Sequence, residues 1–109
     1  MAFRVSLSGP AETDAYEAYE HVRSVAPMKA EGWLVKLFQA ILSLDEMPTR
    51  CAVIPEAEEL GFTVRHLLHG RGRGTYRIIF SLDENEPHVK VLRIWHAFRE
   101  AITANDVRD

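Results

Sequence analysis

The sequence predicts an α+β fold with the element order β-α-α-β-β-β, in which a helical hairpin packs on one face of a mostly antiparallel sheet. Apolar and polar residues alternate over 3–7 and in runs between 64 and 96, as they do in strands. Residues 11–44 instead hold two stretches whose apolar residues recur every three or four positions, as on one face of a helix. A chain of 109 residues has the size of one domain, so we expect a single domain over residues 1–109.

The first half of the chain contains the expected first strand and the hairpin. The alternation over 3–7 stops at Gly9-Pro10, and proline is well tolerated at the first position of a helix. One amphipathic helix is predicted over about 11–25. Pro27 separates it from a more apolar helix over about 28–44. Because the break between them is short, the two helices are expected to run antiparallel.

The second half reads as a long connection followed by three strands. Pro48 and Pro55 interrupt residues 45–62, whereas 64–68, 75–82 and 88–96 have the composition of strands. The middle of the last two strands is apolar on both faces, which is typical of central strands. The helices are expected to cover only one face of this sheet, so the other face is expected to be open.

Basic charge is concentrated in the predicted sheet. Residues 65–99 carry seven Lys and Arg against three Asp and Glu, although the whole chain has a formal net charge of −3. An acidic chain is unsuited to coating nucleic acid, so any contact with a polyanion must be local. The single Cys51 excludes an internal disulfide and a CxxC zinc site, which favours a reducing, cytoplasmic location.

Strand alternation predicts which basic side chains share the open face. The alternation places Tyr76, Ile78 and Phe80 on the face toward the helices and Arg77 on the other face, which the row Lys90, Leu92, Ile94 and His96 of the last strand is expected to share. The predicted phosphate- or RNA-binding residues are Arg65, Arg71, Arg73 and Arg77. The predicted catalytic residues are Arg77, His96 and Arg99. Arginines would stabilise charge on a phosphate and His96 would move a proton. No metal is then required if a ribose 2′-hydroxyl attacks the adjacent phosphate. No metal, other cofactor or membrane segment is expected.

Three stretches resemble one known family. Residues 64–70 (VRHLLHG), 74–80 (GTYRIIF) and 89–99 (VKVLRIWHAFR) are similar to the RelE/ParE superfamily of bacterial type II toxins, and the resemblance covers about residues 3–100. In this family an arginine that contacts phosphate directly follows a tyrosine in the sequence. The resemblance places Arg77, which follows Tyr76, at the position of that arginine. Two departures are present: no tyrosine follows Tyr76, and the basic pair of the preceding strand is reduced to Arg65. His96 would then replace the missing base.

The resemblance implies a toxin that is neutralised by a cognate antitoxin protein, in some cases as a heterotetramer, in modules that include plasmid-stabilisation systems. RelE-like members cut mRNA on the ribosome, and ParE-like members inhibit DNA gyrase without a nuclease site. Our first hypothesis is therefore a ribosome-dependent mRNA interferase, an endoribonuclease that arrests growth. A gyrase inhibitor and a degenerate member that only binds its antitoxin remain as alternatives.

Overall fold

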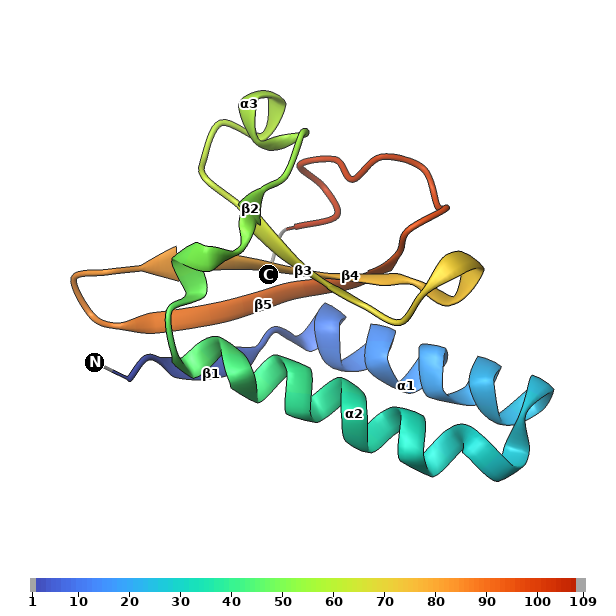
Figure 1. Ribbon diagram of the computed structural model, residues 1–109. Coiled ribbons are helices and arrows are strands. Elements are labelled where there is room, and N and C mark those ends of the chain that lie inside the picture. The colour runs from blue at the N-terminus through green and yellow to red at the C-terminus, as the bar shows by residue number, and fades with distance from the viewer. Residues whose placement is uncertain (1, 108–109) are drawn as a thin grey trace.

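The computed structural model describes residues 2–107 and consists of a sheet with two long helices on one face (Figure 1). The hairpin helices are α1 (Gly9–Val25) and α2 (Ala30–Leu42), joined by a short 3-10 turn at Pro27–Lys29. One further short helix is α3 (Ala57–Leu60). The strands are β1 (Arg4–Leu7), β2 (Ala52–Val53), β3 (Arg65–His69), β4 (Tyr76–Asp83) and β5 (His88–His96).

The strand order across the sheet is β1-β5-β4-β3-β2. The first strand pairs in parallel with the last, and the other neighbours are antiparallel. The α+β class, the hairpin on one face and the mostly antiparallel sheet are thus confirmed. The short strand β2 was not predicted, because it is a two-residue segment within the proline-interrupted connection.

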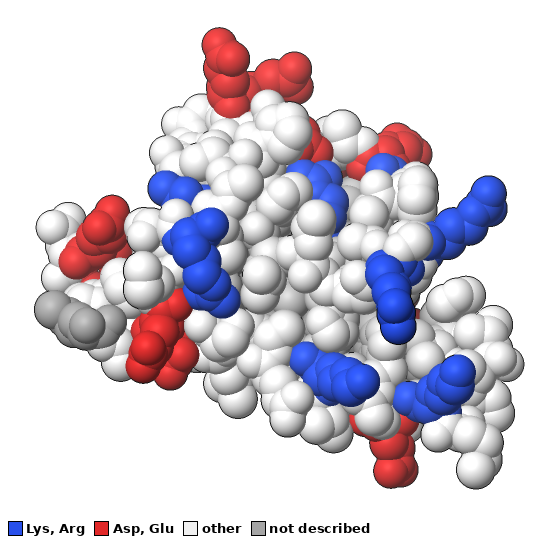
Figure 2. Space-filling model, viewed as in Figure 1, with Lys and Arg blue, Asp and Glu red and all other residues white. Residues whose placement is uncertain are grey.

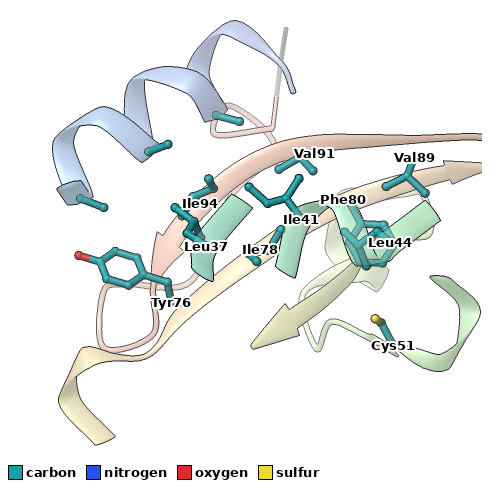
Figure 3. Close-up of a cluster of buried hydrophobic side chains, with 13 residues drawn as sticks. Leu37, Ile41, Leu44, Cys51, Tyr76, Ile78, Phe80, Val89, Val91 and Ile94 are labelled. Atoms are coloured by element: carbon teal, nitrogen blue, oxygen red, sulfur yellow. The ribbon is translucent and has the colours of Figure 1, made fainter. Parts of the chain in front are cut away.

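The main core lies between the sheet and the hairpin. Figure 3 shows side chains of β4 and β5 pointing toward those of α2, and the labelled residues of this cluster are Leu37, Ile41, Leu44, Cys51, Tyr76, Ile78, Phe80, Val89, Val91 and Ile94. Ile78 and Phe80 are fully buried, as the predicted alternation of β4 requires. Each such side chain contributes roughly 1.5–3 kcal/mol of hydrophobic stabilisation.

A β-bulge changes the direction of side chains in β5. Ile79 pairs with Arg93 and Phe80 pairs with Val91, so Leu92 is an extra residue in the strand. Beyond this point the alternation is inverted, and Ile94 packs in the core beneath the helices. The prediction that Leu92, Ile94 and His96 share one open face was therefore wrong.

The face of the sheet opposite the hairpin is covered, which also corrects the sequence-based expectation. The connection around α3 and the segment after β5 fold over it, as Figure 1 shows. Their second apolar cluster consists of Ile54, Val64, Ile79, Leu92, Trp95, Ile102 and Val107. Trp95 Nε1 donates a hydrogen bond of 2.8 Å to the Glu100 carbonyl, which fixes the start of the covering segment.

The start of α1 is attached to the bulged part of β5. Ser8 caps the helix by accepting from the Ala11 amide (3.1 Å), and its hydroxyl donates to the Leu92 carbonyl (2.8 Å). Asp14, which is buried, accepts from the Ile94 amide (3.0 Å) and binds Arg93. The pairing of β1 with β5 ends at Val91. The side chains of Ser8 and Asp14 therefore form the hydrogen bonds to the β5 backbone that a longer β1 would have formed.

Candidate functional site

Arg77 lies on the face of the sheet away from α1 and α2, as predicted, but it is held by a carboxylate. Its Nη1 and Nη2 atoms donate to the two oxygens of Glu56 at 2.9 and 2.8 Å. Its Nε donates to Nδ1 of His66 at 3.1 Å. Both Arg77 and Glu56 side chains are only 12% exposed. The flat edge of the guanidinium that would bind a phosphate is thus occupied by a carboxylate.

Glu56 connects three parts of the chain. Besides its bonds to Arg77 in β4, it accepts from the Ile102 amide in the C-terminal segment at 3.2 Å. Hydrogen bonding to Arg77 lowers the pKa of Glu56 to about 2. Burial, and then the charge of Arg77, lower the pKa of His66, so its imidazole is neutral and free to accept at Nδ1. This network holds the covering segment on the sheet.

Arg65 also acts within the fold. Its Nη1 atom donates to the Cys51 carbonyl at 2.6 Å and to the Thr49 carbonyl at 3.4 Å. Its Nε is buried without a hydrogen-bond partner in the described part of the chain. The side chain therefore fastens the segment before β2 to β3, and the structure does not place it in a shared patch with Arg77.

His96 lies on the other face of the sheet from Arg77. It pairs with Tyr76, whose ring is 5.1 Å from the His96 ring, whereas Arg77 pairs with Trp95. The Phe98 amide donates to Nδ1 of His96 at 3.2 Å. Nε2 must then carry the proton, and it lies 2.7 Å from the Arg73 carbonyl, to which it donates. Both ring nitrogens are engaged, and the expected grouping of Arg77 with His96 is not formed.

The remaining predicted residues gather at the end of the sheet that carries the β3–β4 loop. Arg71 and Arg73 are exposed on this loop, and neither pairs with a carboxylate among residues 2–107. The Arg99 guanidinium lies 3.8 Å from the centre of the Trp95 ring. Arg99 and His96 line one small cavity, so these two predicted residues do come close together.

An apolar groove of about 560 Å³ lies beside β1 and the hairpin, lined mainly by Val5, Leu7, Tyr16, Leu34 and Phe38. β1 is an edge strand of the sheet. Because the amides of Arg4 and Ser8 bond to carbonyls of β5 or its preceding turn, the alternate amides of β1 point to the outer edge. The groove therefore offers apolar side-chain positions next to a strand edge that another strand can join.

Comparison with known proteins identifies the family. Residues 5–100 match the model of the ParE toxin of the type II toxin-antitoxin system parDE. This chain belongs to the ParE toxin family. No curated protein matches it significantly.

Two solved structures have the same fold as this ParE-family chain. One is from a chromosomal ParDE toxin-antitoxin system of P. aeruginosa, with a TM-score of 0.66, 18% identity and coverage of 87% of this chain and 96% of the other. The other is from the RelBE2 toxin-antitoxin complex of Mycobacterium tuberculosis, with a TM-score of 0.50, 17% identity and coverage of 88% and 99%. The sequence-based assignment to the RelE/ParE superfamily is confirmed, and the chain is a type II toxin.

Residues that sequence reasoning missed decide the geometry of this ParE-family toxin. Glu56 lies 21 positions before Arg77, and nothing in its local sequence indicates the pairing. Phe98 is an aromatic residue with a side chain that is 70% exposed, which indicates a binding role. Its exposure could not be predicted from the sequence. Within residues 2–107, no three His, Cys, Asp or Glu side chains approach as metal ligands, and no helix could cross a membrane.

Proposed function

We propose that this toxin arrests growth by binding DNA gyrase and inhibiting it, without cleaving RNA. The observation that carries this proposal is the bidentate pairing of Arg77 with Glu56 on a covered face of the sheet. The membership in the ParE family supports the same choice. The interferase hypothesis required that arginine to be available to a phosphate.

The chemistry of RNA cleavage explains why this pairing matters. A phosphodiester is cleaved efficiently when a positive group holds the phosphate and an acid-base group lies within hydrogen-bond reach of the reacting atoms. Arg77 and His96 lie on opposite faces of the sheet. Freeing Arg77 would break a mostly buried ion pair, which costs roughly 3–5 kcal/mol. Inhibition through surface contact needs neither group.

We further propose that the chain is neutralised by an antitoxin that occupies the groove beside β1. The two solved structures of similar fold come from toxin-antitoxin systems. The groove combines a free strand edge with exposed apolar side chains, including Tyr16 (65% exposed) and Phe38 (41% exposed). An extended segment of the antitoxin can add a strand to β1 and insert apolar side chains between the helices and the sheet.

The experiment compares gyrase inhibition with RNA cleavage in one preparation. We expect purified toxin to block negative supercoiling by gyrase, and induced cells to keep intact messages in primer extension. A Glu56→Gln/Arg77→Met double variant, which removes both partners of the pair, should still inhibit gyrase. Undisturbed supercoiling together with cleaved messages that require Arg77 would refute the proposal and restore the interferase hypothesis. Inhibition of neither process would leave only antitoxin binding and would also refute it.

A further inference from the structure

A row of aromatic rings runs along the end of the molecule near the β3–β4 loop. The Trp33 ring lies 5.9 Å from His69 and 5.6 Å from Tyr76, Tyr76 lies 5.1 Å from His96, and His96 lies 5.9 Å from Phe98, measured between ring centres. Tyr76 is buried, whereas Phe98 at the outer end is 70% exposed. The buried Tyr76 and the half-buried His96 therefore support a ring that is presented to solvent.

Basic side chains surround this row of rings. Lys29, Arg71 and Arg73 line a cleft of about 590 Å³ together with Trp33 and His96. None of the three basic residues has a carboxylate partner among residues 2–107. In Figure 2, Lys and Arg side chains are spread across the face from left of centre to its right side, and Asp and Glu lie mostly toward its edges. We call the cleft lined by Trp33, Arg71, Arg73 and His96, together with the adjoining Phe98, the ring-arginine cleft.

We propose that the ring-arginine cleft binds single-stranded nucleic acid. An unpaired base stacks on the exposed Phe98 ring beside His96, and Arg71 and Arg73 on the adjacent loop bind the neighbouring phosphates. Arg73 and Phe98 line one common cavity with His96, so a base and its phosphate can be held at the same time. Bases in a duplex are already stacked on each other, so this geometry favours a single strand.

The hydrogen bonds of His96 support a binding role in place of the predicted catalytic one. Its two nitrogens hold the Phe98 amide and the Arg73 carbonyl. The imidazole thereby fixes the stacking ring and the phosphate-binding loop relative to each other.

An acidic peptide would use the same arginines, but it would leave the exposed Phe98 without a stacking partner. Acidic side chains are also near: Asp14 and Glu17 line the cavity beside Arg99, so we assign no phosphate to that residue.

The test is fluorescence anisotropy with the purified toxin and short labelled oligothymidine and oligouridine. We expect saturable binding that weakens as salt is raised, and the tighter of the two probes identifies DNA or RNA as the source. Phe98→Ala should weaken binding about 5- to 100-fold, the range for removing one base-stacking interaction. The matched control Phe62→Ala, an exposed phenylalanine beside α3, should bind as the unaltered protein does.

A second pair of variants measures the binding of phosphates. Arg71→Gln/Arg73→Gln should reduce the slope of log affinity against log salt by about 0.7 for each phosphate that the toxin no longer binds. Arg4→Gln in β1, which removes an exposed charge on another strand, should leave the slope unchanged. The circular dichroism spectrum of each variant confirms that it is folded.

Three results would overturn the inference. They are absence of binding at low salt, Phe98→Ala binding as tightly as the unaltered toxin, and equal displacement of the oligonucleotide by polyglutamate, which would indicate an acidic-peptide site. The inference does not depend on the proposed function. Gyrase inhibition without oligonucleotide binding would refute the cleft alone, and oligonucleotide binding without gyrase inhibition would refute the proposed function alone.

Discussion

Replacing Glu56 by Gln tests the ion pair on which the functional argument depends. The substitution keeps the size of the side chain and removes its charge, so Arg77 is left without a carboxylate partner. Because the Arg77 side chain is only 12% exposed, water cannot fully replace the lost partner. The Ile102 amide would also face a weaker acceptor, which loosens the C-terminal segment from the sheet.

The magnitude follows from the pKa of Glu56. Hydrogen bonding to Arg77 lowers this pKa from 4.5 to about 2. At about 1.4 kcal/mol for each pKa unit, the interactions of this carboxylate, of which the hydrogen bonding to Arg77 is the largest, together contribute roughly 3 kcal/mol to the free energy of unfolding. Breaking a mostly buried pair by removing one partner costs roughly 3–5 kcal/mol, which agrees. We therefore expect Glu56→Gln to destabilise the toxin by about 3 kcal/mol at pH 7.

The pH dependence has a definite sign. A carboxyl whose pKa is lowered in the folded state stabilises that state above its unfolded pKa, here 4.5. The stabilisation declines as the pH falls below this value and is lost near pH 2, the folded pKa. The unaltered toxin should lose this contribution on acidification. The Glu56→Gln variant has no carboxyl at this position to titrate, so its stability should not show this part of the pH dependence.

Urea unfolding followed by circular dichroism measures both effects, at pH 7 and at several values between 5 and 3. Glu59→Gln is the matched control: Glu59 is an exposed residue of the neighbouring α3, and its substitution should change stability by less than about 0.5 kcal/mol. The Glu56→Gln/Arg77→Met double variant should recover part of the loss. A Glu56→Gln toxin as stable as the control, or with the same acid dependence as the unaltered protein, would refute the reasoning.

Two further predictions concern the β3–β4 loop and the groove. Gly70 has φ +89°, and a Cβ there would overlap the Gly74 carbonyl, so Gly70→Ala should cost more than about 2 kcal/mol in thermal unfolding. Gly61→Ala, with φ +82° but no atom within 4 Å, should cost only about 1 kcal/mol, and equal losses would contradict the steric explanation. Phe38→Asp in the groove should weaken antitoxin binding in calorimetry at least about 30-fold while gyrase inhibition persists. Met28→Asp, at a 97% exposed position outside the groove lining, should not, and unchanged affinity of Phe38→Asp would remove the groove as the antitoxin site.

The elements that depend on local pattern were predictable. The alternation of β4 correctly placed Ile78 and Phe80 under the hairpin and Arg77 on the other face. The apolar periodicity of the two helices and the break at Pro27 correctly predicted the hairpin. These features depend on residues only a few positions apart in the sequence. Over such short distances the backbone geometry of a helix or strand fixes the face on which each side chain lies.

The partners of the predicted site residues were not predictable in the same way. The bulge at Leu92 inverts the end of β5 and places His96 beside Tyr76, and no local signal in the sequence marks that residue as extra. A one-residue shift moves every later side chain to the other face. The alternation therefore predicted a common face for Arg77 and His96 that the folded sheet does not have.

The sequence by itself determined the fold class, the superfamily and the concentration of arginines around the β3–β4 loop, because each depends on composition or on short-range order. Only the tertiary structure decided which arginines are available. Glu56 meets Arg77 after a separation of 21 residues, whereas Arg71 and Arg73 find no carboxylate in the described chain. Charge pairing acts over a few ångströms in space, and the folding of distant segments sets those distances.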